Sequence, residues 1–258
     1  MPWVLRGLRN GILTSRYPRR PDPTAVFESV ARPTGPPSQD PIVPTLCPTG
    51  AIEADHGGRI RLDQGRCIGC GACVRERPEL FEWAPGPELA RARRAALVVP
   101  EAAGTDEELA AVRRELSLRT RALRRSVHVR HVDTGSDGSE EWEVLALQNP
   151  VYDVHRLGIF FTTSPRHADV LLVTGAGAHG MAAPLRRTLE AMPNPTVVIA
   201  AGTDAISGGM VNPGYAVAPG AVAELIDVDI WVPGSPPTPI SLLHALLMAI
   251  GRLRPERR

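Results

Sequence analysis

Cys67, Cys70 and Cys73 are spaced as C-x2-C-x2-C, with a glycine in each gap. This spacing lets a short loop wrap a cubane iron–sulfur cluster while each thiolate binds a different iron. A fourth ligand is required, and the only other cysteine of the chain is Cys47, which is followed by Pro48. Together the four cysteines predict one [4Fe–4S] cluster, held by Cys47, Cys67, Cys70 and Cys73.

The position of Cys47 matches the bacterial two-cluster ferredoxin pattern. In that pattern each motif reads C-x2-C-x2-C-x3-C-P, and the last cysteine of one motif binds the cluster held by the other motif. Cys47-Pro48 is then the end of a first motif whose other ligands are missing. Counted by the same spacing, the ligand positions of the twin cluster are filled by Pro37, Asp40, Val43 and Arg77. We therefore expect a ferredoxin-like domain reduced to a single cluster.

Two other uses of four cysteines remain open. Four thiolates also form structural zinc sites, and two disulfides would use the same residues. A zinc ribbon more often has two separated C-x2-C pairs, whereas a disulfide framework is typical of short secreted chains. The cluster is the favoured interpretation because the C-x2-C-x2-C spacing fits it best.

The length and charge of the chain narrow the classes of function. With 258 residues it has room for one large domain or two smaller ones. Its net charge of +1 gives no general attraction to nucleic acid. No apolar run reaches the roughly 18 residues of a membrane span, and no leader pattern opens the sequence. We expect a cytoplasmic protein that does not bind nucleic acid.

Local patterns surround the cysteines in the first half. Residues 1–18 predict a short basic amphipathic helix that lies on a partner, on a membrane surface or on its own domain. Residues 19–46 are rich in proline and predict an irregular surface segment. Residues 51–62 predict a hairpin with its turn at 56–58. Residues 105–125 begin with a capping box and continue with leucines at helical spacing, which predicts a bridging helix.

From residue 126 the pattern changes to alternating strands and helices. This alternation implies a mostly parallel sheet covered on both faces, in a flavodoxin-like doubly wound α/β domain. We therefore expect a ferredoxin-like α+β domain over residues 1–100, a linker helix over 101–125 and the α/β domain over 126–258. The expected strands are 127–132, 159–162, 170–174, 196–200 and 229–232, and the expected helices are 140–147, 181–192 and 240–253.

The second half resembles the small iron–sulfur subunit shared by respiratory complex I and the group 4 [NiFe]-hydrogenases. The resemblance is carried by the stretches VRHVDTGS at 129–136, NPVYD at 149–153, SPRHADVLLVTG at 164–175, PLRR at 184–187, SGG at 207–209 and VPGSPP at 232–237. The first half resembles the two-cluster ferredoxin-type subunit of the same complexes, including GILTSRYP at 11–18. The resemblance implies a fusion of two subunits that exchange electrons.

The chain departs from that family where the small subunit normally binds its own [4Fe–4S] cluster. The resemblance places four cysteine ligands at positions that are here Asp137, Ser139, Asp204 and Ser235. Oxygen groups suit magnesium or calcium better than an iron–sulfur core. We expect the α/β domain to hold no conventional cluster, and these side chains to fill the vacated space by hydrogen bonding or, as an alternative, to bind a second metal at Asp137 and Asp204.

Three functions follow from these residues and the resemblance. The favoured one is an iron–sulfur electron-transfer subunit of a complex I-like or hydrogenase-like assembly, with no complete active site of its own. Its partners would be other subunits of a membrane-associated oxidoreductase complex, including a hydrogenase-like large subunit, and residues 1–18 would make any peripheral contact with the inner face of the membrane. The alternatives are a scaffold or redox-sensing subunit with a structural cluster, and a flavin- or nucleotide-binding reductase.

Overall fold

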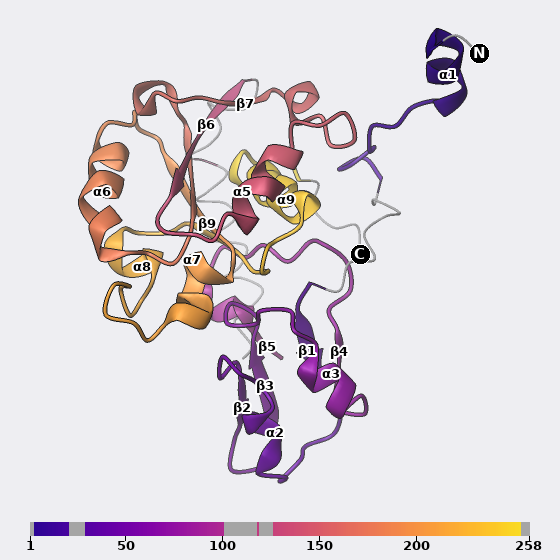
Figure 1. Cartoon of the computed structure of the whole chain (residues 1–258), viewed down its shortest axis with the longest axis vertical. Helices are drawn as coiled ribbons and strands as arrows, with labels where there is room; N and C mark the ends of the chain where they lie inside the picture. The colour runs from indigo at the N-terminus through magenta and orange to yellow at the C-terminus, as the bar shows by residue number, and fades with distance from the viewer. Residues whose placement is uncertain (1–2, 21–28, 101–117, 119–125, 254–258) are drawn as a thin grey trace.

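The chain folds into an N-terminal part and an α/β part. The computed structural model describes residues 3–20, 29–100, 118 and 126–253 (Figure 1). Two small sheets form the N-terminal part, and one five-stranded sheet forms the α/β part. The helix predicted over 105–125 lies outside the described residues apart from Leu118.

The sheet of the α/β part is entirely parallel and follows the order β10-β9-β8-β6-β7. Its central strands are buried on both faces, as expected for a sheet covered by helices on each side. The strand order reverses between β6 and β8, which is the flavodoxin-like doubly wound arrangement, so the predicted fold class is confirmed. The strands are β6 (Val127–Asp133), β7 (Ile159–Phe161), β8 (Val170–Thr174), β9 (Val197–Ala201) and β10 (Ile230–Val232).

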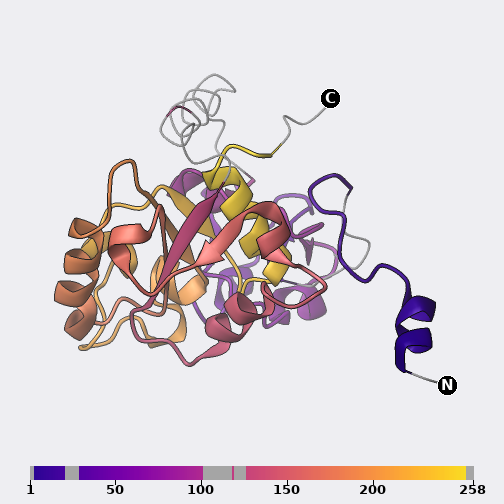
Figure 2. The same ribbon diagram turned by 90° about the horizontal axis from the view of Figure 1, so that it is seen from above.

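Two helical layers cover this sheet, and alternate strand residues point into two separate cores. One core lies under α5 (Ser139–Ala146) and α9 (Pro239–Ala249). The other lies under α6 (Ala182–Glu190), α7 (Thr203–Ser207) and α8 (Val222–Leu225). Figure 2 shows α6 and α9 on opposite sides of the strands. Short 3-10 turns connect these elements at η3 (Val154–Leu157), η4 (Pro165–His167), η5 (His179–Met181) and η6 (Gly209–Val211).

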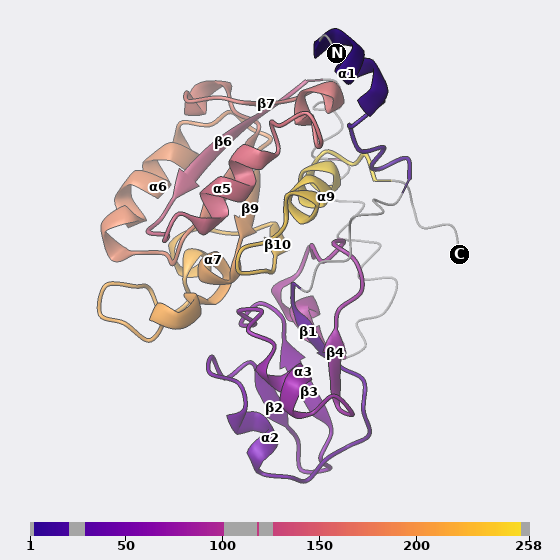
Figure 3. The same ribbon diagram turned by 45° about the vertical axis from the view of Figure 1, so that its right-hand side comes forward.

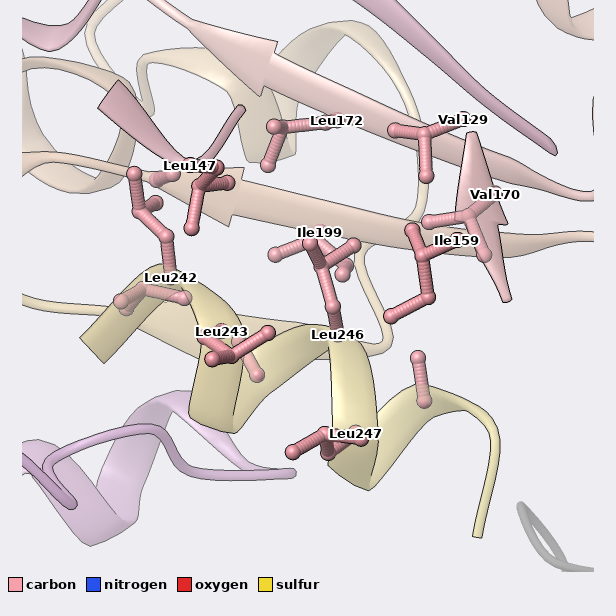
Figure 4. Packing of buried hydrophobic residues seen from close by; sticks show 14 of the residues in the cluster. Val129, Leu147, Ile159, Val170, Leu172, Ile199, Leu242, Leu243, Leu246 and Leu247 are labelled. Atoms are coloured by element: carbon pink, nitrogen blue, oxygen red, sulfur yellow. The ribbon is translucent and has the colours of Figure 1, made fainter. Parts of the chain in front are cut away.

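Helix α9 is buried around nearly its whole circumference. Its leucines pack against the sheet, where Leu246 lies close to Ile199 (Figure 4). The helix begins at Pro239, and the hydroxyl of Thr238 caps it by accepting a hydrogen bond from the Ser241 amide over 3.2 Å. Tyr17 belongs to the same core and its hydroxyl lies 2.7 Å from His244 Nδ1 of α9, so the N-terminal segment and α9 pack together.

The N-terminal part contains two antiparallel sheets. In one, β1 (Ala31–Pro33) pairs with β4 (Phe81–Trp83). In the other, β2 (Ile52–Ala54) pairs with β3 (Ile60–Asp63), which confirms the predicted hairpin, and β3 also pairs with β5 (Val98–Val99). The remaining elements are α2 (Ile42–Thr45), α3 (Ala72–Glu76) and η1 (Arg94–Leu97).

The prediction of an irregular surface segment over residues 19–46 is partly wrong. Strand β1 lies within it, and Val30, Ala31 and Val43 are at most 1% exposed. These apolar side chains belong to the same small core as Cys67 and Cys73. Burial against the cysteine loops therefore overrides the local effect of the prolines.

Helix α1 (Trp3–Asn10) projects away from both parts (Figures 1 and 2). Its apolar residues Leu5 and Leu8 are 48% and 75% exposed, so the helix does not pack on the described residues of its own chain. The segment that follows is fixed to the α/β part, because Ser15 donates its backbone N–H to the Val151 carbonyl over 2.7 Å. Among the described residues, no helix has both the length and the apolar character needed to cross a membrane.

Candidate iron–sulfur centre

The four cysteines line one cavity in the N-terminal part. Cys67 and Cys73 are buried, Cys47 is half-buried and Cys70 is exposed. Apart from the thiols the walls are largely apolar. The cavity is completed by Ala31, Leu46, Ala51, Ile52, Leu62, Ile68, Gly71 and Ala72.

Two left-handed glycines shape the loop that carries three of the cysteines. Gly69 and Gly71 have φ values of +66° and +68°, which side chains rarely adopt. A Cβ atom on Gly69 would lie 2.8 Å from the Ser29 carbonyl oxygen, and one on Gly71 would lie 2.9 Å from the Trp83 ring. The loop can therefore turn tightly between successive cysteines only with glycine at both positions.

Backbone hydrogen bonds and burial act on the thiols in opposite directions. The amide of Ala51 donates to the Cys47 sulfur over 3.2 Å. Burial raises the pKa of Cys67, against hydrogen bonds from the backbone of Ala31 and Gly69. Burial and the neighbouring Cys67 raise the pKa of Cys73 to about 11. Cys67 and Cys73 are therefore protonated without metal, and metal binding to them would release protons.

This donor set fits an iron–sulfur cluster. Four sulfur ligands, apolar walls and amide donors to sulfur are the features by which proteins hold such clusters and set their potential. In the described ranges, no three His, Cys, Asp or Glu side chains are gathered closely enough for a single metal ion.

The positions of the twin cluster hold an ion pair and an apolar side chain. The Arg77 guanidinium lies 2.6 Å from the Asp40 carboxylate, and Val43, three residues after Asp40, is fully buried. Pro37 is exposed. Contact between Asp40 and Arg77, 37 residues apart, is the convergence that the ferredoxin spacing predicts.

The four residues at the expected cluster-ligand positions of the α/β part differ in their exposure to solvent. Asp137 and Ser235 are exposed, whereas Ser139 and Asp204 are half-buried. Asp137 accepts the Ser139 amide over 2.9 Å, and hydrogen bonds from Ser139 lower the pKa of Asp137. Burial raises the pKa of Asp204, with the nearby charges of Asp137 and Glu141 adding to the effect.

Sequence reasoning missed Glu140, the most deeply buried carboxyl group of this region. Its exposed fraction is 1%, and its carboxyl group rests on Gly202, where a Cβ atom would lie 2.5 Å from Oε1. Ser139 Oγ donates to it over 3.2 Å. Burial, Asp204 and Glu141 raise the pKa of Glu140 to about 7. In the sequence it resembles any acidic residue in the first turn of a helix, so no pattern marked it.

Glu141, the next residue, lies in an environment that favours its ionised form. Its carboxylate accepts hydrogen bonds from Ser136 over 2.6 Å and from Thr174 over 2.5 Å, and it lies 3.6 Å from His131 Nε2. Burial opposes ionisation, but these hydrogen bonds lower the pKa of Glu141. For His131, burial disfavours the charged imidazolium and so lowers the pKa. Glu141 is thus the ionised neighbour of the buried Glu140.

The cysteine loop touches the α/β part at α7. Thr203 Oγ1 donates to the Cys67 carbonyl oxygen over 2.8 Å. Arg91 and Trp231 exchange two backbone hydrogen bonds of 2.9 and 2.8 Å nearby. Figure 3 shows α7 and β10 on the side of the α/β part that faces the N-terminal part. The predicted cluster loop therefore lies directly beside the segment that contains Asp204.

A cleft of about 470 Å³ also lies between the two parts. Gly69 of the cysteine loop lines it, together with Ser235 and Glu143. Burial raises the pKa of Glu143, which has no ion-pair partner among the described residues. No cationic side chain lines this cleft within the described ranges.

Comparison with known proteins assigns a family to each part of the chain, beginning with the α/β part. The family model for the 20 kDa subunit of NADH ubiquinone oxidoreductase matches residues 138–249. A probable membrane-bound hydrogenase subunit, mbhJ, of Pyrococcus furiosus is 37% identical over 129 residues, which cover 50% of this chain and 77% of that protein. The chain belongs to the 20 kDa subunit family. An uncharacterized protein of Methanocaldococcus jannaschii is 40% identical over 124 residues, covering 48% and 82%.

The N-terminal part matches a second model, the 4Fe-4S single cluster domain, over residues 60–114. Formate hydrogenlyase subunit 7 of Escherichia coli is 36% identical over 155 residues, which cover 60% of this chain and 59% of that subunit. The chain thus spans less than two thirds of that relative. The resemblance inferred from the sequence is confirmed, and an iron–sulfur centre is supported as the cofactor.

Proposed function

We propose that the chain is an electron-transfer subunit of a complex I-like or hydrogenase-like assembly, with a single [4Fe–4S] cluster bound by Cys47, Cys67, Cys70 and Cys73. The observation that carries the proposal is the cavity in which these four thiols meet. The cluster would supply one-electron chemistry when bound. The chain's own residues bury Cys67 and Cys73, donate the Ala51 amide to the half-buried Cys47 and leave Cys70 at the surface.

The domain assignment follows from the same proposal. Residues 1–100 would be the cluster domain, 101–125 a linker and 126–258 a docking domain that has lost its own cluster. Thiolates would be needed to hold a second cluster, and Asp137, Ser139, Asp204 and Ser235 offer only oxygen. An electron on the remaining cluster must therefore pass to another subunit.

The partners would be other subunits of a membrane-associated oxidoreductase, including a hydrogenase-like large subunit. The relatives of this chain carry names of hydrogenase and formate hydrogenlyase subunits. Exposed Leu5, Leu8, Ile12 and Leu13 give the N-terminal segment an apolar surface for such a partner or for the inner face of the membrane.

Reduction of the anaerobically purified protein with dithionite tests electron transfer directly. We expect bleaching of the visible absorbance and an EPR signal from one reduced cluster, both lost in Cys67→Ser and both retained in Ser139→Ala. Protein that carries the cluster but cannot be reduced would contradict an electron-transfer role.

The contact between Thr203 and Cys67 supports a second candidate, a scaffold subunit in which the cluster joins the two parts. In that case Cys67→Ser would separate the two parts while the wild-type cluster stayed oxidised under turnover of the assembled complex. Freeze-quench EPR of the complex during turnover distinguishes the two functions, because only an electron carrier cycles.

A further inference from the structure

Glu140 is a buried carboxyl group on the first turn of α5. Among the described residues no arginine, lysine or histidine forms an ion pair with it, and the neutral Ser139 hydroxyl donates a hydrogen bond to its carboxyl group over 3.2 Å. A buried carboxylate without a cation is costly, so such a group is expected to take up a proton readily. Glu140 is therefore suited to hold a proton inside the protein.

Among the described residues, the charges that act on Glu140 come from α5 and α7, and both are negative. Glu141 follows Glu140 on α5 and Asp204 lies on α7, whereas Asp137 in the loop before α5 acts on Asp204. His131 interacts with Glu141 rather than with Glu140. Added negative charge nearby raises the affinity of a carboxylate for a proton.

Arg94, a cationic side chain that approaches α7 from the N-terminal part, is paired with a carboxylate. Arg94 approaches Gly65, whose Cβ position also meets Ile206 of α7. Its guanidinium is held by Asp63 through bonds of 2.8 and 2.6 Å. A second cation, Arg75, contacts the cysteine loop itself and donates to the Cys70 carbonyl oxygen over 2.8 Å.

A continuous segment connects Glu140 to that loop. The carboxyl group of Glu140 rests on Gly202, and the next residue, Thr203, donates to the Cys67 carbonyl. Thr203 is fully buried, so the space between the cysteine loop and Glu140 has a low effective dielectric. A charge placed on the cluster would act on Glu140 with little screening by water.

We propose that Glu140 is a redox-linked proton acceptor for the cluster of the N-terminal part. One electron from an iron–sulfur or flavin donor enters the cluster, and one proton from solvent converts the Glu140 carboxylate into the neutral acid. Reoxidation by the acceptor subunit returns the proton. Asp204 stabilises the protonated form, and Thr203 fixes the distance between the two groups.

The inference depends on the proposed function, because it requires a redox-active cluster. Potentiometric titration of the purified protein with EPR detection, from pH 5 to pH 9, tests it. Uptake of one proton per electron lowers the reduction potential by 59 mV per pH unit. We expect a slope of this order in the wild-type protein near neutral pH, and a flat profile in Glu140→Gln.

Two other variants test the assignment to Glu140. Glu190→Gln, an exposed carboxyl group on α6, is the matched control and should keep the wild-type slope. If Glu143→Gln removed the slope and Glu140→Gln kept it, the proton would belong to Glu143 in the cleft between the parts, and the inference would be overturned. A pH-independent wild-type potential would overturn it as well.

Infrared difference spectroscopy gives a readout that does not depend on the potential. Reduced-minus-oxidised spectra should show a protonated carboxyl C=O band that is absent from Glu140→Gln and present in Glu190→Gln. Absence of that band from the wild type would contradict proton uptake. Protein without iron, in contrast, would contradict the proposed function itself, so the two failures are distinguishable.

Discussion

Thr203 Oγ1 donates a hydrogen bond to the carbonyl oxygen of Cys67 over 2.8 Å, with both residues buried. This bond joins the loop that carries three cysteines to the helix that carries Asp204. The four-cysteine site is thereby connected to Asp204, which stands where the resemblance implies a cysteine ligand. The two halves are therefore a single folded unit at this point.

Replacing Thr203 by valine tests that contact. The change keeps the shape but leaves the Cys67 carbonyl without this donor, so we expect a loss of about 1 to 3 kcal/mol in the free energy of unfolding. Urea denaturation monitored by cluster absorbance measures it. Thr188→Val, which removes an exposed hydroxyl bond on α6, should cost less than about 0.5 kcal/mol. Equal losses in the two variants would show that the contact has no special role.

The pair Arg77–Asp40 should behave as a partly exposed ion pair and not as part of a cofactor site. A double-mutant cycle with Arg77→Ala and Asp40→Ala should give a coupling energy of about 0.2 to 1 kcal/mol. The iron content of both single variants should equal that of the wild type. A fall in iron content in the stably folded Asp40→Ala variant would show instead that Asp40 helps to bind the metal.

Glu140 should make stability depend on pH. Its pKa is raised from 4.5 to about 7, so the folded state binds the proton more tightly than the unfolded state. This stabilisation is full below about pH 4.5 and is lost as the pH rises to about 7. The loss should amount to about 1 to 3 kcal/mol.

Urea denaturation of metal-free protein at pH 5 and pH 8 measures this effect. Glu140→Gln should remove the part of the pH dependence that Glu140 contributes, whereas Glu190→Gln should keep it. If Glu140→Gln kept the full difference between the two pH values, another group would be responsible for it.

Helix α1 should contribute to docking and not to folding. Leu8 is 75% exposed, so Leu8→Glu should change the free energy of unfolding by less than about 0.5 kcal/mol. The same change should reduce co-sedimentation with anionic lipid vesicles or with the purified partner complex. Leu62→Glu, at a site that is 1% exposed, should unfold the N-terminal part. Unchanged sedimentation of Leu8→Glu with both would exclude α1 as a docking element.

Much of the fold was predictable because its signals are local. Every expected strand of the α/β part is present within one or two residues, since buried parallel strands appear as continuous apolar runs such as 170–174. The order of the strands depends on pairing between distant segments, and no order was predicted from the sequence. Strand β1 was missed because its three residues pair with β4, about fifty residues further along the chain.

The cysteine set was predictable for a different reason. The spacing of Cys67, Cys70 and Cys73 is typical of a loop that wraps a cluster, and Cys47 is the only other cysteine of the chain. Glu140 was not predictable, because its burial depends on Gly202 and Asp204, more than sixty residues away. Sequence spacing identifies ligands of one loop, whereas a buried carboxyl group depends on contacts across the fold.

The iron and acid-labile sulfide content of the anaerobically purified chain, with EPR of the reduced state, tests the single-cluster assignment most directly. One [4Fe–4S] cluster predicts about four irons and four sulfides per chain in the wild type, and none in Cys67→Ser. About eight irons would mean that Asp137, Ser139, Asp204 and Ser235 mark a second cluster site after all. Stoichiometric zinc without sulfide would contradict an electron-transfer role.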